Sequence, residues 1–238
     1  MRFLKEGGVS NPPLSPPLTY FVNPYNPINR HEHHLPHWQQ GSIFYFLTWR
    51  LADSLPLSKL KAWKSEREAW LACHQEPWNL EIEKEYHERF SQEIDEWLDQ
   101  GEGSCLLRNT TYSTIVAKAI LHFDGERYTV ASFVIMPNHV HVLFCLYDGR
   151  RLEEIVKLWK GFSAREINRL MGKSGSFWQA DYWDRMIRNL GHFNRCMEYI
   201  RENPAKANLE KNEFVFYESD GGLFHIENNG GQECPPSF

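Results

Sequence analysis

The sequence predicts an α+β protein in which one antiparallel β-sheet has helices packed on one face. The expected elements run in the order strand, helices, strand, strand, helix, short strand, helix. Two of the strands are separated by a tight turn, which favours an antiparallel pair. Hydrophobic residues make up 42% and charged residues 24% of the 238 residues, as in a globular protein with one sizeable core.

The chain begins with a stretch that we expect to form an extended arm. Residues 1–40 contain two Pro-Pro pairs and four clustered histidines, His31, His33, His34 and His37. This composition favours a solvated tail over a packed element. Adventitious metal binding by the histidines is the alternative.

A strand and a helical insertion follow the arm. Residues 42–50 (SIFYFLTWR) are dense in aromatic and β-branched side chains, which predicts the first strand. From 57 to 97 apolar residues recur at three- and four-residue intervals on either side of Pro77, which predicts a helical hairpin. The insertion 54–104 is acidic, with 12 Asp and Glu against 6 Lys and Arg. It shows no convergent polar group, so we expect a role in packing or partner contact.

The middle of the chain predicts a helix and a strand pair. Residues 110–123 have apolar positions at helical spacing, and Asn109 precedes them as an N-cap. Residues 128–135 and 140–146 are apolar runs on either side of a Pro-Asn turn. They are expected to form an antiparallel hairpin.

The last third of the chain predicts two more helices. Residues 152–171 form a long amphipathic pattern, and 177–187 are short, aromatic and partly extended. A final helix is expected over 192–203, stopped by Pro204 because proline cannot continue it. Residues 210–238 are expected to form a C-terminal tail.

The net charge of −5 hides an uneven distribution. Residues 150–206 hold 12 Lys and Arg against 7 Asp and Glu, so this part of the chain offers a surface suited to phosphates. No apolar run reaches the roughly 18 residues that a membrane span needs, and the N-terminus lacks a signal-peptide core. We therefore expect a cytoplasmic protein with no membrane partner.

The stretch MPNHVHVLF places two histidines one residue apart. In a strand His139 and His141 point to the same face, either as satisfied core side chains or as half of a metal site. In the final helix Tyr199 and Asn203 stand four residues apart and share a face. An asparagine oxygen can complete a hard-cation site with two imidazoles, and a metal makes a nearby phenol useful against a phosphodiester.

These motifs carry a resemblance to a known family. The MPNHVHVL stretch resembles the His-hydrophobic-His (HUH) motif of single-tyrosine transposases, which belong to the HUH endonucleases. The stretches FWQ…YWDRMIR and YIRENPAKA continue the pattern downstream, and LPHW and FLTWRLADSLP precede it. From about residue 35 to 209 the sequence resembles the REP-associated tyrosine transposases of bacteria, which occur beside short palindromic repeats.

The resemblance implies a ferredoxin-like antiparallel sheet within a transposase domain over 41–209. It implies Tyr199 as the nucleophile and Mg²⁺ or Mn²⁺ as the cofactor, held by His139, His141 and Asn203. It also implies cleavage and strand transfer of single-stranded DNA at hairpin-forming repeats, through a 5′-phosphotyrosine intermediate. Such a protein would be nucleoid-associated and act in DNA transposition and recombination, and a homodimer is one alternative for its assembly.

Further residues are candidates for DNA contact. Basic side chains would bind phosphates and tryptophans would stack on bases, and the candidates are Lys157, Lys160, Arg185, Arg188, Trp178 and Trp183. Solvated helix faces and core tryptophans would give the same pattern.

Other assignments stay open. Tyr182 is a second candidate nucleophile, although it lacks a helical asparagine partner. Glu198 and Glu202 flank the site, but adjacent helical positions face away from it. Two other functions are a non-cleaving binder of structured single-stranded DNA and a metal-dependent phosphodiesterase without a covalent step, for which Tyr199 would be dispensable.

Overall fold

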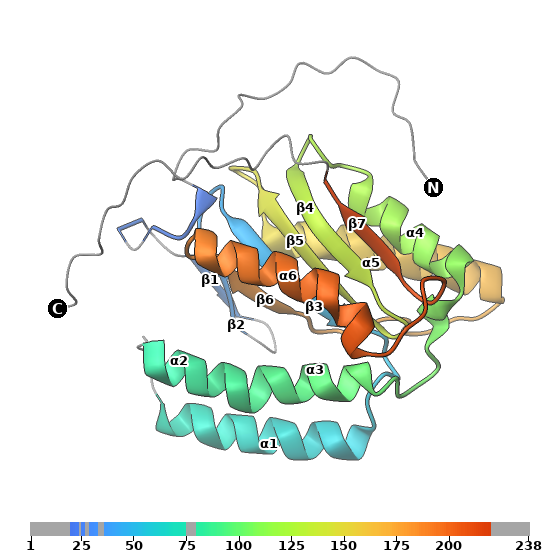
Figure 1. Ribbon diagram of the computed structural model, residues 1–238, viewed down its shortest axis with the longest axis horizontal. Helices are drawn as coiled ribbons and strands as arrows, with labels where there is room; N and C mark the ends of the chain where they lie inside the picture. The colour runs from blue at the N-terminus through green and yellow to red at the C-terminus, as the bar shows by residue number, and fades with distance from the viewer. Residues whose placement is uncertain (1–19, 24, 27–28, 33–35, 75–79, 220–238) are drawn as a thin grey trace.

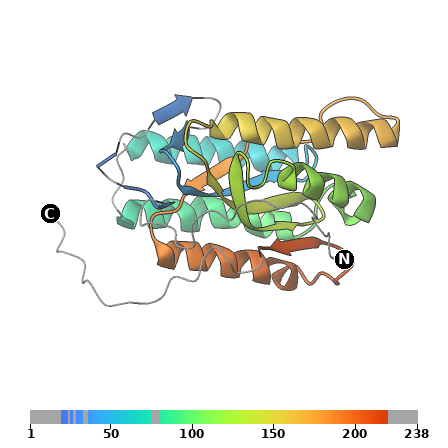
Figure 2. The same cartoon turned by 90° about the horizontal axis from the view of Figure 1, so that it is seen from above.

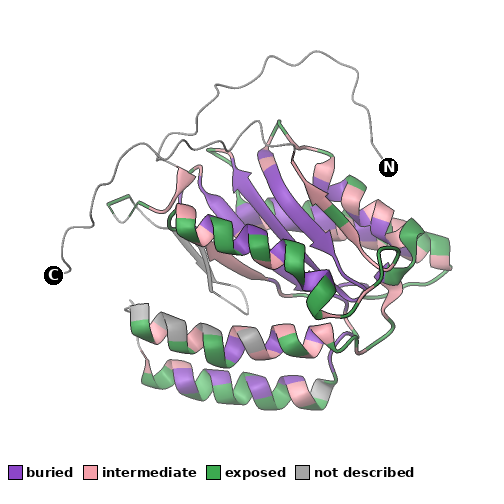
Figure 3. Ribbon diagram, in the orientation of Figure 1, coloured by how far each residue is buried: buried purple, intermediate pink, exposed green. Residues whose placement is uncertain are grey.

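The computed structural model describes residues 20–23, 25–26, 29–32, 36–74 and 80–219. Their centre is a sheet in the order β6-β3-β5-β4-β7, in which every neighbouring pair is antiparallel (Figure 1). The strands are β3 (Phe44–Arg50), β4 (Tyr128–Ile135), β5 (His139–Leu146), β6 (Trp183–Met186) and β7 (Val215–Glu218). Every residue of β5 is buried, so the candidate histidines lie on the most enclosed strand (Figure 3).

Two helical connections give the sheet its ferredoxin-like topology. α4 (Thr110–Leu121) leads into β4, which is separated from β3 in the sheet by β5. α5 (Leu152–Met171) joins β5 to β6, which are separated by β3. Each connection thus skips one strand, as in a split βαβ arrangement. The predicted α+β class and antiparallel sheet are confirmed.

Helices cover both faces of this sheet. α4 and α5 pack on one face through Val116, Ile120, Val156 and Trp159. α6 (Leu190–Lys206) packs on the opposite face, as Figure 2 shows from above. The expectation that the helices lie on one face is therefore wrong for α6. The physical reason is that β4 and β5 are apolar on both sides, so each side needs cover.

The predicted helical hairpin is confirmed as a separate layer beside α6 (Figure 1). One arm is α1 (Leu57–Cys73), and the other runs from α2 (Leu80–Tyr86) through a π-helical turn (His87–Ser91) into α3 (Gln92–Asp99). The hairpin has its own apolar cluster, which includes Leu60, Trp63, Trp70, Phe90, Ile94 and Leu98. The insertion thus has a small core of its own.

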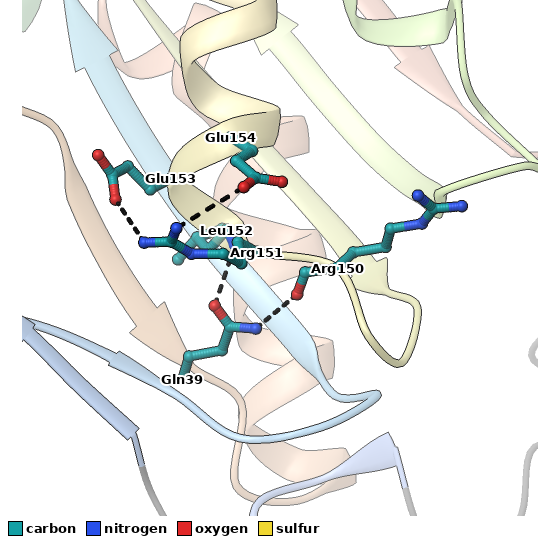
Figure 4. A network of polar contacts seen from close by, with 6 residues as sticks. All are labelled: Gln39, Arg150, Arg151, Leu152, Glu153 and Glu154. Carbon is teal, nitrogen blue, oxygen red and sulfur yellow. Dashed lines mark hydrogen bonds and ion pairs between the residues drawn. The ribbon is translucent and has the colours of Figure 1, made fainter.

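Part of the predicted N-terminal arm pairs as strands β1 (Asn29–Glu32) and β2 (Pro36–Gln39). Gln39 links this pair to α5, because its Oε1 accepts the Leu152 N–H at 3.0 Å and its Nε2 donates to the Arg150 carbonyl (Figure 4). A side chain from β2 therefore caps the start of α5. Residues 1–19 and the side chains of the histidine cluster lie outside the described part of the arm.

The C-terminal region departs from the expected tail. Residues 215–218 form β7 and pair with β4, while 220–238 lie outside the described residues. α6 also continues through Pro204 to Lys206, so the expectation that Pro204 stops the helix is wrong. Proline removes one N–H donor, but the helix ends within a turn and the Ala207 N–H still donates to the Asn203 carbonyl at 3.1 Å. Among the described helices, none is long and apolar enough to span a membrane.

Candidate active site

Two imidazoles on the central strand form one half of the candidate site. His139 and His141 of β5 lie on the sheet face that α6 covers. The Nδ1 of His139 lies 2.7 Å from the Asn138 Oδ1, and that of His141 lies 2.7 Å from the Thr48 Oγ1. The Asn138 Nδ2 donates to two backbone carbonyls of the insertion, which leaves its oxygen facing His139. Because that oxygen only accepts, the Nδ1 of His139 carries the proton.

The other nitrogen of each imidazole has no hydrogen-bond partner in the described part of the chain. The Nε2 atoms of His139 and His141 are buried and accept no hydrogen bond from any described residue. Burial lowers the pKa of His139 to about 3, and burial together with His139 lowers the pKa of His141 well below its ordinary value. Both rings are therefore neutral at pH 7. With its Nδ1–H directed at Asn138, His139 keeps a lone pair on Nε2 for a ligand, and His141 does the same in the tautomer in which its Nδ1–H donates to the Thr48 hydroxyl.

α6 supplies the second half of the site. The ring of Tyr199 meets His141 edge-on, with centroids 5.2 Å apart and planes at 81°. Phe46 of β3 stacks on His141 at 5.5 Å and contacts the Tyr199 ring at 5.8 Å. Phe46 thus orients the phenol and the imidazole together.

Asn203 lies one helical turn beyond Tyr199 and next to its hydroxyl. Its side chain is fully buried, and neither its Oδ1 nor its Nδ2 has a hydrogen-bond partner among the described residues. An unsatisfied buried polar group costs about 1–3 kcal/mol, so such a group indicates a function or a bound ligand.

These residues fit a divalent cation. Among the described residues the two Nε2 lone pairs and the Asn203 Oδ1 have no other partner. The amide oxygen suits Mg²⁺ and Mn²⁺, and the imidazole nitrogens suit borderline metals such as Zn²⁺. Within the described residues no cluster of three or more His, Cys, Asp or Glu side chains could hold a metal. A three-residue ligand set at this site therefore requires the Asn203 amide oxygen in addition to the two histidines.

The insertion brings two carboxylates to Tyr199 that sequence reasoning missed. Asp95 of α3 is a second polar neighbour of the Tyr199 hydroxyl besides Asn203, although the geometry falls short of a formed hydrogen bond. Burial, Asp95 and Asp99 raise the pKa of Tyr199 well above its ordinary value. Burial also raises the pKa of Asp95 to about 7, despite the opposing effects of Tyr199 and Arg185.

Asp99 adds to the same acidic group. Burial raises its pKa to about 6, against the opposing effect of Lys206. Asp95 and Asp99 stand four residues apart, the same spacing as Tyr199 and Asn203. This four-residue spacing indicates in the sequence that Asp95 and Asp99 share one face of a helix. It did not mark them as site residues, because an acidic helix usually presents such pairs to solvent.

Two of the predicted DNA contacts have structural roles. The Lys160 Nζ donates to the carbonyls of Gln179, Ala180 and Asp181 at 2.8, 2.7 and 3.2 Å. Trp178 is 6% exposed, and its indole N–H donates to the Ser163 Oγ at 3.0 Å. These contacts use the ammonium and bury the indole, so we do not retain Lys160 and Trp178 as DNA contacts.

The other predicted basic residues differ in their place. Arg185 of β6 lies opposite Phe46 in the strand register, on the face of the site, and its charge acts on Asp95. Arg188 is exposed in the connection from β6 to α6. Lys157 is exposed on α5, across the sheet from Tyr199. Arg185 is therefore the basic candidate beside the phenol.

The alternative site residues lie elsewhere. Tyr182 is buried in the apolar cluster on the α4 and α5 side of the sheet, with the Lys160 Nζ 5.8 Å from its ring centroid. Glu198 is exposed, and Glu202 pairs with Lys206 at 3.1 Å on the outer side of α6. The structure thus does not bring these three residues to the imidazoles.

Comparisons with known proteins agree with the resemblance. Residues 109–203 match the model of a family described as "Transposase IS200 like", a range that contains His139, His141, Tyr199 and Asn203. A REP-associated tyrosine transposase of Escherichia coli (strain K12) is 24% identical over 98 residues, which are 41% of this chain and 57% of the relative. The chain thus spans little more than half of the length of that relative.

Two solved structures are also similar. A REP-associated tyrosine transposase bound to a REP hairpin has a TM-score of 0.45 and 18% identity, over 76% of this chain and 77% of that chain. A transposase-like protein from Deinococcus radiodurans R1 has a TM-score of 0.33 and 15% identity, over 69% of this chain and 93% of that chain.

Proposed function

We propose that this chain, which the family match relates to the IS200-like transposases, cleaves and rejoins single-stranded DNA at hairpin-forming repeats with Tyr199 as nucleophile. The observation that carries the proposal is a set of buried polar atoms around the Tyr199 phenol, on His139, His141 and Asn203, that have no hydrogen-bond partner among the described residues. A site that only binds DNA has no need of a phenol beside unpaired ligand atoms.

In the proposed reaction the Tyr199 oxygen forms a bond to the phosphorus of a phosphodiester. The bond from phosphorus to the 3′-oxygen breaks, which leaves the 5′-phosphate on tyrosine and a free 3′-hydroxyl. Asp95 is the carboxylate beside the phenol, and a pKa of about 7 suits a proton acceptor at neutral pH. Asp95 can then pass that proton to the departing 3′-oxygen, so the step is balanced.

Each neighbouring residue has a part in this scheme. His139, His141 and Asn203 would hold Mg²⁺ or Mn²⁺, which when bound polarises the phosphate and stabilises charge on the leaving oxygen. Phe46 keeps the Tyr199 ring against His141. Arg185 lies on the same face and would contact the phosphate.

The proposed substrate follows from the relatives and the charge. One relative is named for its association with REP sequences, and the basic region 150–206 suits a nucleic acid partner. We propose hairpin DNA with unpaired flanks as the substrate and the bacterial cytoplasm, at the nucleoid, as the location. A monomer and a homodimer are alternatives, and the transposase domain is proposed to extend over 41–209.

The test is a denaturing gel of the full chain with hairpin oligonucleotides and Mn²⁺. We expect a covalent protein–DNA adduct that Tyr199→Phe abolishes and that the control Tyr182→Phe, in the opposite core, retains. His139→Ala should abolish cleavage and leave hairpin binding largely intact. Cleavage that survives Tyr199→Phe would contradict the proposal and favour a phosphodiesterase without a covalent step. Binding without cleavage or adduct would favour the non-cleaving binder.

A further inference from the structure

A second site lies where the insertion meets the sheet. A pocket of about 120 Å³ is lined on one side by α1, through Trp63 and Lys64. Its other side is formed by Arg50 at the end of β3 and by a segment that includes Gln179, Asp181 and Trp183. This volume is smaller than that of pockets that bind drug-sized ligands, so the pocket can hold a ligand about the size of one aromatic ring system.

Arg50 is the polar group that this pocket leaves unsatisfied. Its side chain is 1% exposed, and its Nη1 donates to the Ser54 Oγ at 3.0 Å. Its Nε is buried and has no partner among the residues that the structure describes. The guanidinium carbon lies 5.8 Å from the centroid of the Trp183 ring. A buried N–H donor without an acceptor in a pocket indicates an acceptor on a ligand.

The other walls narrow the chemistry of that ligand. The side chains of Trp63 and Trp183 line the pocket and contact each other edge to face, with planes at 90° and centroids 6.4 Å apart, so they give a flat ligand aromatic walls. The Asp181 carboxylate supplies an acceptor, and the Lys64 Nζ lies 3.9 Å from it. A matching ligand is planar, with acceptors on one edge and donors on another.

We propose that this pocket binds one unpaired guanine of the single-stranded DNA substrate, an inference that rests on the proposed function. Guanine offers the O6 and N7 acceptors to Arg50 and the N1–H and N2–H donors to Asp181. The amino groups of adenine (N6) and cytosine (N4) are donors, so in this position each would face the guanidinium donors of Arg50 without an acceptor. Thymine has a single N–H and no amino group for the carboxylate.

The pocket is next to the candidate active site in the strand register. Arg50 is the cross-strand partner of His139, and Trp183 is the partner of Thr48, which bonds to His141. A guanine in the pocket would therefore belong to a nucleotide near the attacked phosphate. The insertion, through Trp63 and Lys64, would contribute to the choice of DNA sequence.

The test measures binding in EDTA, where no cleavage occurs, by fluorescence anisotropy of hairpin oligonucleotides. The unpaired flank is dT except for one dG, dA or dC, which is moved along it. We expect one position at which dG binds about 10-fold tighter or more, the effect of one bidentate base contact. Inosine, which lacks the N2 amino group, and 7-deazaguanine, which lacks N7, should each lose most of this gain.

Variants assign the preference to the pocket. The Asp181→Asn variant should bind oligonucleotides that contain dG and inosine with equal affinity. The Arg50→Lys variant should lose the preference for dG and keep its affinity for an all-dT flank. The control Lys157→Ala, on the far face, should keep the preference. If Arg50→Lys fails to fold, the modified bases on the unmodified protein still decide.

Three results would overturn the proposal. If the protein still forms the Tyr199 adduct but binds the four bases with equal affinity at every position, the guanine proposal for the pocket is wrong and the proposed function stands. A preference for dG that both variants retain places the contact elsewhere. No binding to any hairpin removes both proposals.

Discussion

Asn138 joins the histidine motif to the insertion through one amide. Its oxygen accepts from His139, and its nitrogen donates to the Leu98 and Glu102 carbonyls at 3.0 and 3.2 Å. Such outer contacts fix the tautomer of a ligand histidine. The sequence places Asn138 beside His139, but its link to the insertion joins residues about 40 positions apart. No local pattern reports such a contact.

The candidate residues themselves were predictable because they sit in regular elements. Strand alternation puts His139 and His141 on one face, and helical spacing does the same for Tyr199 and Asn203. The roles of Lys160 and Trp178 were not predictable. A lysine that donates to three carbonyls and a tryptophan in the core have the same sequence signature as residues that contact DNA.

Asp95→Asn should make the folded protein more stable at high pH. The folded state raises the pKa of Asp95 to about 7, so the stability that this carboxyl contributes is complete below its unfolded pKa and is lost as pH rises through 7. Each pKa unit is worth about 1.4 kcal/mol, and partial exposure of Asp95 screens part of it. We expect a gain of about 1–2 kcal/mol at pH 8 that vanishes near pH 4, measured by urea unfolding.

The groups that act on Asp95 are the neutral phenol of Tyr199 and the titratable or charged side chains of Arg185, Asp99 and Glu96. If Asp95 accepts the Tyr199 proton, Asp95→Asn should also slow cleavage by about 100-fold or more without weakening hairpin binding. Unchanged cleavage would contradict that role.

At the level of elements, the strongest patterns were predicted well, β6 was predicted only as part of an extended segment over 177–187, and β7 was missed. β3, β4, β5, α4 and α5 have long apolar patterns with clear turns or caps, such as Asn109, whose side chain accepts the Thr111 N–H. β6 and β7 are four residues each, too short for a period to be read. β7 depends on pairing with β4, which composition does not report.

Phe90→Ala should unfold the insertion and spare the sheet. Phe90 is 1% exposed in the π-helical turn and packs against Trp63, Trp70 and Tyr86, all within the separate hairpin cluster. Loss of a buried phenylalanine costs about 3–5 kcal/mol. Hydrogen exchange should show lost protection in α1 and α3 and unchanged protection in β4 and β5.

The matched control is Phe162→Ala on α5, where the ring is 44% exposed. We expect this change to leave the exchange of both regions as it is. Equal loss of protection in the sheet and the hairpin after Phe90→Ala would show that the two clusters unfold as one unit.

For the whole molecule, the closed site has a kinetic consequence. His139, His141 and Asn203 are at most 1% exposed, and α3 lies beside the phenol. A metal ion or a phosphodiester can reach these atoms only after the cover opens. The observed rate of Mn²⁺ binding should therefore level off as the Mn²⁺ concentration rises, because opening becomes the slow step.

Stopped-flow measurement of Mn²⁺ binding checks this expectation. Phe90→Ala, which loosens the insertion, should raise the plateau, and Phe162→Ala should leave it unchanged. A binding rate that stays proportional to the Mn²⁺ concentration up to the millimolar range would show that movement of the hairpin does not limit access to the site.

The position of the insertion also bears on how the chain folds. Strand β3, which lies between β6 and β5, is synthesised before both of these partners, since Arg50 pairs with His139 and Tyr45 with Met186. The cost of closing a loop grows only with the logarithm of its length, by roughly 0.6 kcal/mol for each doubling. Residues 54–104 more than double the length of the segment between β3 and β5, and the hairpin forms from local contacts. The insertion of a helical hairpin between β3 and β4 therefore hardly changes the entropic cost of pairing β3 with β5.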